Sequence, residues 1–142
     1  MNRDEICERY AAGERNFRGL DLAGINLSQF NLAGADLSQS NLSGARLNGA
    51  CLHKALLKGA NLQNADLQSA DLVDADLSGA NLTNADLRAA FLWRTNLTSA
   101  KLHGTKLHWA ALTQVVPADI DLSSAIVSRT VLPSGSPSNE QR

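Results

Sequence analysis

The sequence predicts an all-β fold, a right-handed quadrilateral parallel β-helix, from three observations. Leucine occupies every fifth position from Leu22 to Leu112, nineteen times in succession, and Phe17 opens the series in the same register. Alanine stands two residues before most of these leucines. Eight of the ten glycines stand two residues after a position of the series. These features together define a five-residue repeat with the leucine at its centre.

A period of five excludes the two common regular elements. Leucines five apart would spread around an α-helix, which turns about 100° per residue, and would form no stripe. In a straight strand, side chains alternate between two faces, so leucines five apart would face opposite sides in turn. We therefore expect the chain to bend once per repeat, with the leucine and the residue two before it pointing inward.

The position two residues after each leucine is the expected bend. Asn64 and Asn84 share this position with the glycines, and both residue types tolerate the positive φ that the third residue of a type II turn requires. Four bends close a coil of 20 residues, so residues 17–132 predict about six coils, stacked in parallel about 4.8 Å apart. The expected core ladder includes Phe17, Leu22, Leu42, Leu62, Leu82 and Leu102.

The repeated unit Ala-Asp/Asn-Leu-x-x resembles that of the pentapeptide-repeat family. It occurs, for example, as Ala-Asp-Leu-Ser-Gly at 75–79 and as Ala-Asn-Leu-Thr-Asn at 80–84. The resemblance covers about four fifths of the chain and implies the right-handed quadrilateral β-helix. Most members of that family have no assigned function. The best understood members resemble duplex DNA in shape and charge and bind DNA gyrase, and some dimerise through their C-terminal ends.

The chain is expected to divide into four segments. Residues 1–16 precede the repeat, and Asn2 or Asp4 is suited to begin a short helix there, which caps the β-helix or binds a partner. Residues 17–116 form the regular β-helix. Residues 117–133 form an irregular terminal coil, because Pro117 takes a leucine position without an N–H. Residues 134–142 have the composition of a disordered tail.

Composition favours a cytoplasmic protein that binds no membrane. The chain has 13 basic and 14 acidic residues, a net charge of −1, which gives no overall attraction to anionic partners. No apolar run is long enough to span a bilayer, and the start Met-Asn-Arg-Asp-Glu is too polar for a signal peptide. Cys7 and Cys51 are too few for a disulfide framework and are expected to be reduced.

Charge along the repeat falls into two belts. Residues 61–87 contain five aspartates and no Lys or Arg, whereas residues 88–109 contain four basic residues and no acid. Either the outward aspartates satisfy nearby backbone groups, or they contribute to a DNA-like acidic surface. The net charge and the basic belt count against the second interpretation. DNA binding through the basic belt is also disfavoured, because four charges neutralise few phosphates.

Stacking by 20 residues predicts one exposed apolar patch. Val73 and Trp93 fall in the same outward column, Phe91 is the other outward residue on the strand of Trp93, and Trp109 occupies a nearby bend. Such a patch indicates a contact site, unless the rings merely pack on each other and on the C-terminal tail. The candidate contact patch comprises Val73, Phe91, Trp93, Arg94 and Trp109.

The C-terminal end carries a second set of apolar candidates. Val116, Ile126 and Val131 lie where the repeat becomes irregular, and the register directs Ile126 and Val131 outward. They indicate either end-to-end association of two copies or folding back of the tail. The resemblance slightly favours the dimer.

Motifs for catalysis are absent from the sequence. It contains no Gly-rich phosphate loop, no nucleophile elbow and no His-Glu-x-x-His. Cys51 and His53 flank Leu52, but only Asp71 would stand near them as a third ligand, so no metal site is expected. We therefore expect no enzyme and no cofactor, but an interaction or scaffold module for an unknown protein or a second copy. The alternative is a DNA-mimicking regulator or protector of DNA gyrase or another topoisomerase.

Overall fold

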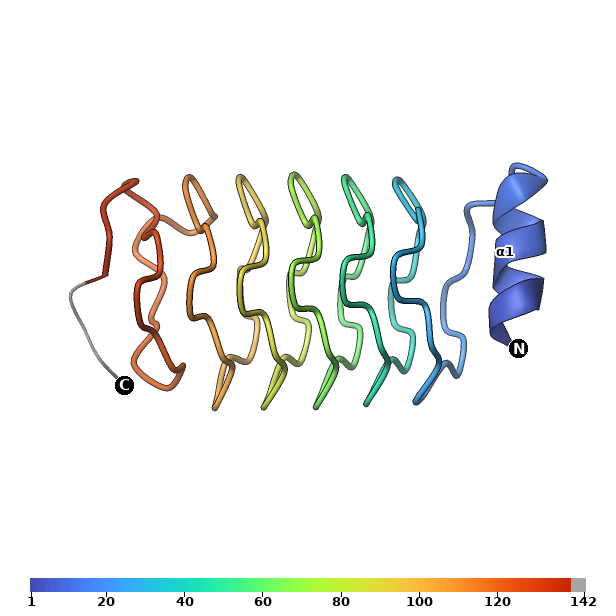
Figure 1. The fold of residues 1–142 in the computed structure, drawn as a ribbon, viewed down its shortest axis with the longest axis horizontal. Coiled ribbons are helices and arrows are strands. Elements are labelled where there is room, and N and C mark those ends of the chain that lie inside the picture. Colours follow the sequence, from blue (N-terminus) through green and yellow to red (C-terminus); the bar gives the residue numbers. More distant parts are fainter. Residues whose placement is uncertain (139–142) are drawn as a thin grey trace.

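The computed structural model describes residues 1–138 of the chain. These residues form a rod of stacked coils with a helix across its N-terminal end (Figure 1). Helix α1 (Arg3–Ala11) is the one helix of the described chain. The sides of the coils are so short that they carry isolated parallel bridges, one bridging residue per side, instead of longer strands.

The bridges have the 20-residue period that the sequence predicts. Asn61 pairs with Asn81, and Asn81 pairs in turn with Lys101. The Leu62 N–H donates to the Asn81 carbonyl at 2.8 Å, and the Asn81 N–H donates to the Ala60 carbonyl at 2.9 Å. Each coil is therefore hydrogen-bonded to the next along every regular side, as in a parallel ladder.

The bends occur where the glycines indicated them. All 20 bend residues from Gly19 to Gln114 have positive φ. A turn hydrogen bond closes every bend after the one at Gly19, as from the Ala65 N–H to the Leu62 carbonyl at 3.1 Å. Twelve of the 20 are not glycine, and they include Arg94 (φ 58°) and Trp109 (φ 64°). The fold thus imposes the left-handed backbone conformation even on residues with large side chains.

The interior is a ladder of leucine with alanine beside it. Leu22, Leu42, Leu62 and Leu82 are at most 1% exposed and Leu102 is 7% exposed, and the ladder begins at the buried Phe17. Burial of a leucine side chain contributes about 1.5–3 kcal/mol, so this ladder is the main source of stability of the rod.

Helix α1 covers the N-terminal end of the ladder. Asn2 caps it by accepting a hydrogen bond from the Glu5 N–H at 2.9 Å. Ile6 is 1% exposed and belongs to the core. The Tyr10 hydroxyl donates to the Ala33 carbonyl at 2.8 Å and ties the helix to the first coil.

The series of bridges between coils is interrupted on one side of the terminal coil and then resumes. Pro117 follows a cis peptide bond, and residues 117–121 form no bridge to the preceding coil. The Gly104 N–H donates to Ser124, one residue beyond the regular register. Pairing of Lys106 with Ile126 and of Ala111 with Val131 restores the 20-residue spacing.

The start of the expected disordered tail has a defined arrangement. Residues 134–138 fold back on the terminal coil, where Pro137 pairs antiparallel with Val131 and the Ser138 N–H donates to Thr130 at 2.7 Å. This differs from the disorder expected from composition, because backbone groups at the edge of the last coil offer hydrogen bonds to the tail. The remainder of the predicted tail, 139–142, lies outside the described residues.

Candidate protein-contact site

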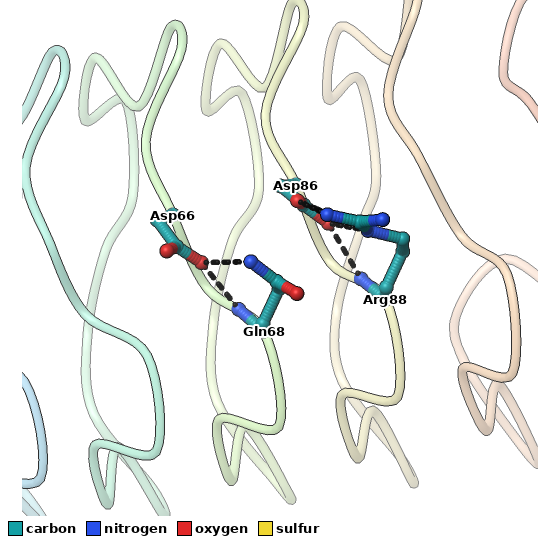
Figure 2. Close-up of polar contacts among 4 residues, drawn as sticks. All are labelled: Asp66, Gln68, Asp86 and Arg88. Atoms are coloured by element: carbon teal, nitrogen blue, oxygen red, sulfur yellow. Dashed lines mark hydrogen bonds and ion pairs between the residues drawn. The ribbon is translucent and has the colours of Figure 1, made fainter.

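The residue before each leucine has a structural task that explains most of the outward acid. Wherever this position is Asp or Asn in the described chain, its side-chain oxygen accepts a hydrogen bond from the backbone N–H two residues later. Figure 2 shows Asp66 bonded in this way to Gln68 at 3.0 Å and Asp86 to Arg88 at 3.1 Å. Such Asx turns stabilise the bend that follows. This geometry supports the first interpretation of the outward aspartates.

Phe91 is one of several residues at this position that are neither Asp nor Asn. It occupies the same position before a leucine, but it has no side-chain oxygen to accept the Trp93 N–H. Its side chain is 51% exposed, and that of Trp93 is 47% exposed. The fold therefore gains neither an Asx turn nor a buried ring from the aromatic residue at 91.

A shallow groove lies beside these two rings. It has a volume of about 420 Å³ and is open to solvent. Phe91 and Trp93 belong to one coil, and the other lining residues, which are mostly small, belong to the two coils before it. The lining residues are Gly49, Ala50, Cys51, Ser69, Asp71, Val73, Phe91 and Trp93.

The structure divides the predicted contact patch. Val73, Phe91 and Trp93 all line the groove, whereas Arg94 and Trp109 do not. Arg94 donates two hydrogen bonds to Asp74, at 2.7 and 3.0 Å. Trp109 is 61% exposed, and the guanidinium of Arg129 lies 5.0 Å from its ring centroid. Arg94 therefore contacts the preceding coil, and Trp109 contacts the following one.

The groove floor contains residues that sequence reasoning did not assign to the patch. Gly49, Ala50, Cys51, Ser69 and Asp71 join it because outward residues 20 apart are neighbours. Asp71 pairs directly with Cys51 on one side and with Phe91 on the other. Counting back from Phe91 in steps of 20 residues would therefore have indicated this part of the groove.

The acidic and basic belts are linked by ion pairs. Burial alone would raise the pKa of Asp86, but hydrogen bonds from the side chain and backbone of Arg88 outweigh it, so the pKa of Asp86 is lowered. The hydrogen bond from Arg94 lowers the pKa of Asp74. Two of the five aspartates of the acidic belt are thus neutralised by the neighbouring basic belt, which makes the surface less DNA-like.

The candidates at the C-terminal end are only partly available. Val116 is 50% exposed. Ile126 and Val131 are partly buried, and Val131 pairs both with Ala111 and with Pro137 of the folded-back tail. The described tail therefore occupies part of the edge that an end-to-end dimer would use.

Buried hydroxyls form a further set that the sequence pattern did not reveal. Thr95 and Thr105 occupy the inward position that is usually alanine, are 0% exposed, and donate to Leu72 at 2.8 Å and Leu82 at 2.7 Å. These bonds are structural. Among residues 1–138, no group of three His, Cys, Asp or Glu side chains is arranged to hold a metal ion.

Comparison with known proteins agrees with this architecture. The model of the Pentapeptide repeats family matches residues 21–59, 52–84 and 80–116, with eight copies of the repeat. This chain belongs to the pentapeptide repeat family. None of the curated proteins compared is similar enough to count as a match.

Several solved structures of pentapeptide repeat proteins, which are of the right-handed β-helix type, are similar to this chain. One from the thylakoid lumen of Arabidopsis thaliana is 32% identical, with a TM-score of 0.65, over 77% of this chain and 73% of that one. HetL of the cyanobacterium Nostoc sp. strain PCC 7120, a protein involved in heterocyst differentiation regulation, is 25% identical over 97% of this chain and 100% of its own, with a TM-score of 0.45. The plasmid-mediated fluoroquinolone resistance protein QnrB1 is 18% identical over 84% of this chain and 78% of its own, with a TM-score of 0.41.

Within the described residues, no helix has the length and apolar character needed to cross a bilayer.

Proposed function

We propose that this protein is a non-enzymatic interaction module that binds a partner protein through the face containing Phe91 and Trp93. The observation that carries the proposal is the groove beside these two half-exposed rings. Other outward positions of the regular coils are mostly polar or charged. Exposed aromatic residues that gather beside a hollow are typical of sites that bind proteins.

Two features weigh against a purely structural role for these rings. Phe91 and Trp93 keep about half of their surface in solvent, so mutual packing leaves much apolar area uncovered. The described tail, residues 134–138, bonds to residues 130–132 and not to this face. The described residues thus leave about half of each ring uncovered.

Partner capture with a matched pair of variants tests the proposal. Trp93→Asp places a negative charge in the groove wall. Gln63→Asp introduces the same charge at the equivalent position of another repeat, outside the groove. We expect proteins retained from a lysate by the wild type and by Gln63→Asp to be lost with Trp93→Asp. Equal retention by all three, with unchanged self-association, would overturn the proposal.

The second candidate is regulation or protection of DNA gyrase as a DNA mimic. The acidic belt of residues 61–87 favours it, although Arg88 and Arg94 pair with two of its aspartates. A supercoiling assay with purified gyrase, with and without a quinolone, tests it. Inhibition or drug protection that falls steeply with salt would support mimicry, and the absence of any effect would leave the interaction module alone.

The compartment and the oligomeric state are part of the same proposal. A cytoplasmic location is part of this proposal and agrees with the free state of Cys7 and Cys51. A second copy remains a candidate partner through the C-terminal end, where Val116 is half exposed. Sedimentation of the wild type against Val116→Asp tests that contact: self-association lost in the variant supports it, and unchanged association contradicts it.

A further inference from the structure

Three aromatic rings of the chain that are at least partly exposed are covered by arginine. The guanidinium of Arg15 lies 3.5 Å from the ring centroid of Tyr10, and that of Arg3 lies 4.2 Å from the ring centroid of Phe30. Arg129 covers Trp109 in the same way at 5.0 Å. A cation over an aromatic face is attracted by the negative charge of the π-system. Three partly exposed rings in different parts of the rod thus have the same kind of partner.

The two rings of the groove lack such a partner within the described residues. Phe91 and Trp93 are about half exposed, yet no described guanidinium or ammonium group lies over either ring. The neighbouring Arg94 is held instead by Asp74 through two hydrogen bonds. The groove therefore presents two open π-faces on a surface where the other partly exposed rings carry a cation.

A carboxylate lies beside these rings. Asp71 lines the groove and pairs with Phe91 along the ladder. One of its oxygens accepts the Val73 N–H at 3.0 Å. In residues 1–138, no cationic side chain forms an ion pair with Asp71, whereas Asp74 and Asp86 both have arginine partners. Its second oxygen is thus available to a charged donor from outside.

We propose that the groove receives an arginine or lysine side chain from an extended segment of the partner protein. The cation would lie against Phe91 and Trp93 and donate to the free oxygen of Asp71, an arrangement that combines cation–π attraction with a charge-assisted hydrogen bond. The rest of the groove is lined mostly by small residues, among them Gly49, Cys51 and Ser69. This inference rests on the proposed function and specifies the chemistry of the partner.

Pools of synthetic heptapeptides test the proposal without knowledge of the partner. The central residue is Arg, Lys, citrulline or Leu, and the three flanking positions on each side are randomised. Citrulline keeps the shape of arginine but removes its charge, so it isolates the contribution of the cation. Binding of each pool to immobilised full-length protein is measured for the wild type, Asp71→Asn and Asp76→Asn.

The two asparagine variants form a matched pair. Asp71 and Asp76 occupy equivalent positions, each accepting the backbone N–H two residues later. Asparagine fills this position elsewhere in the rod, as at Asn61 and Asn81, so both variants are expected to fold. We expect the wild type and Asp76→Asn to retain the Arg and Lys pools about tenfold more than the citrulline and Leu pools, and Asp71→Asn to lose this preference.

The other outcomes overturn the inference. Equal retention of all four pools would define an apolar groove without preference for a cation. A preference that survives in Asp71→Asn would place the cation elsewhere, and no retention of any pool would exclude a basic segment as the occupant. Self-association lost in Asp71→Asn without pool selectivity would assign the groove to a second copy. In each case, loss of partner capture in Trp93→Asp would still support the proposed function.

Discussion

At the scale of single residues, every bend of this rod requires a positive φ, but many of the bend residues are not glycine. All 20 bend residues from Gly19 to Gln114 adopt the left-handed region, which costs a non-glycine residue about 1–2 kcal/mol. Ala89 has φ of 60°, whereas its neighbour Ala90 points into the core and is 1% exposed. These two adjacent alanines therefore have opposite requirements.

The first prediction uses this pair. Ala89→Gly relieves the left-handed strain and is expected to raise the free energy of unfolding by up to about 1 kcal/mol. Ala90→Gly removes a buried methyl group and adds chain flexibility, so it is expected to lower that free energy by about 1 kcal/mol or more. Urea unfolding measures both, and destabilisation by Ala89→Gly would contradict the assignment of strain to the bends.

Residue type determines which of the bends could be predicted from the sequence. Glycine and asparagine marked ten of the bends, because their tolerance of positive φ is a local property. Residues such as Lys54 and Trp109 gave no local signal, since stacking of the coils imposes their conformation. The buried Thr95 was likewise hidden, because its hydrogen bond to Leu72 crosses between coils.

At the scale of the repeat unit, the Asx turn and its ion pairs link stability to pH. The pKa of Asp36 is lowered: burial alone would raise it, but hydrogen bonds from Ser38 and Arg18 outweigh that effect. The pKa of Asp86 is lowered by Arg88 in the same manner. A lowered pKa in the folded state means that protonation favours unfolding, so this stability is present above the unfolded pKa of about 3.9 and is lost as pH falls through the folded pKa.

The second prediction follows from that sign. The melting temperature is expected to change little between pH 7 and about 5, and to fall below about pH 4. Asp86→Asn keeps an oxygen for the Arg88 N–H but loses the ion pair, so its melting temperature should fall less steeply in acid. Thermal scans from pH 7 to 3 measure this, and a wild-type melting temperature that rises in acid would contradict the proposed linkage.

The third prediction concerns the regularity of the coils. Leu62 is 0% exposed in the centre of the rod, whereas Leu122 is partly exposed in the terminal coil. Leu62→Ala is expected to cost about 2–5 kcal/mol of unfolding free energy, and Leu122→Ala clearly less. Similar losses for the two variants, measured by urea unfolding, would mean that the terminal coil is packed as tightly as the regular ones.

The repeat made the regular part of the fold predictable, and its interruption limited prediction at the C-terminal end. Leucines five apart fixed both the bends and the 20-residue stacking. Pro117 signalled an interruption, but not the shift that pairs Gly104 with Ser124, because such a shift depends on how the whole coil closes. The folding back of residues 134–138 was foreseen only as one of two alternatives for the apolar residues of this end.

At the scale of the whole molecule, the rod presents long and mostly polar sides, which are interrupted by exposed aromatic residues at Phe91, Trp93 and Trp109. Its interior is filled by leucine and alanine, so function depends on what the sides display. Stacking by 20 places Val73, Phe91 and Trp93 along one groove, but the sequence does not indicate that Arg94 pairs with Asp74 outside it. The direction of a long side chain depends on the charges around it, which the repeat does not specify.

The central claim is that Phe91 serves a contact and not the fold. The most direct test is the free energy of unfolding of Phe91→Asn, which supplies the missing oxygen for the Trp93 N–H without adding charge beside Asp71. We predict a value that is unchanged or up to about 1 kcal/mol higher than that of the wild type. A decrease of more than about 1 kcal/mol would show that the ring is part of the packing of the rod, and would contradict the claim.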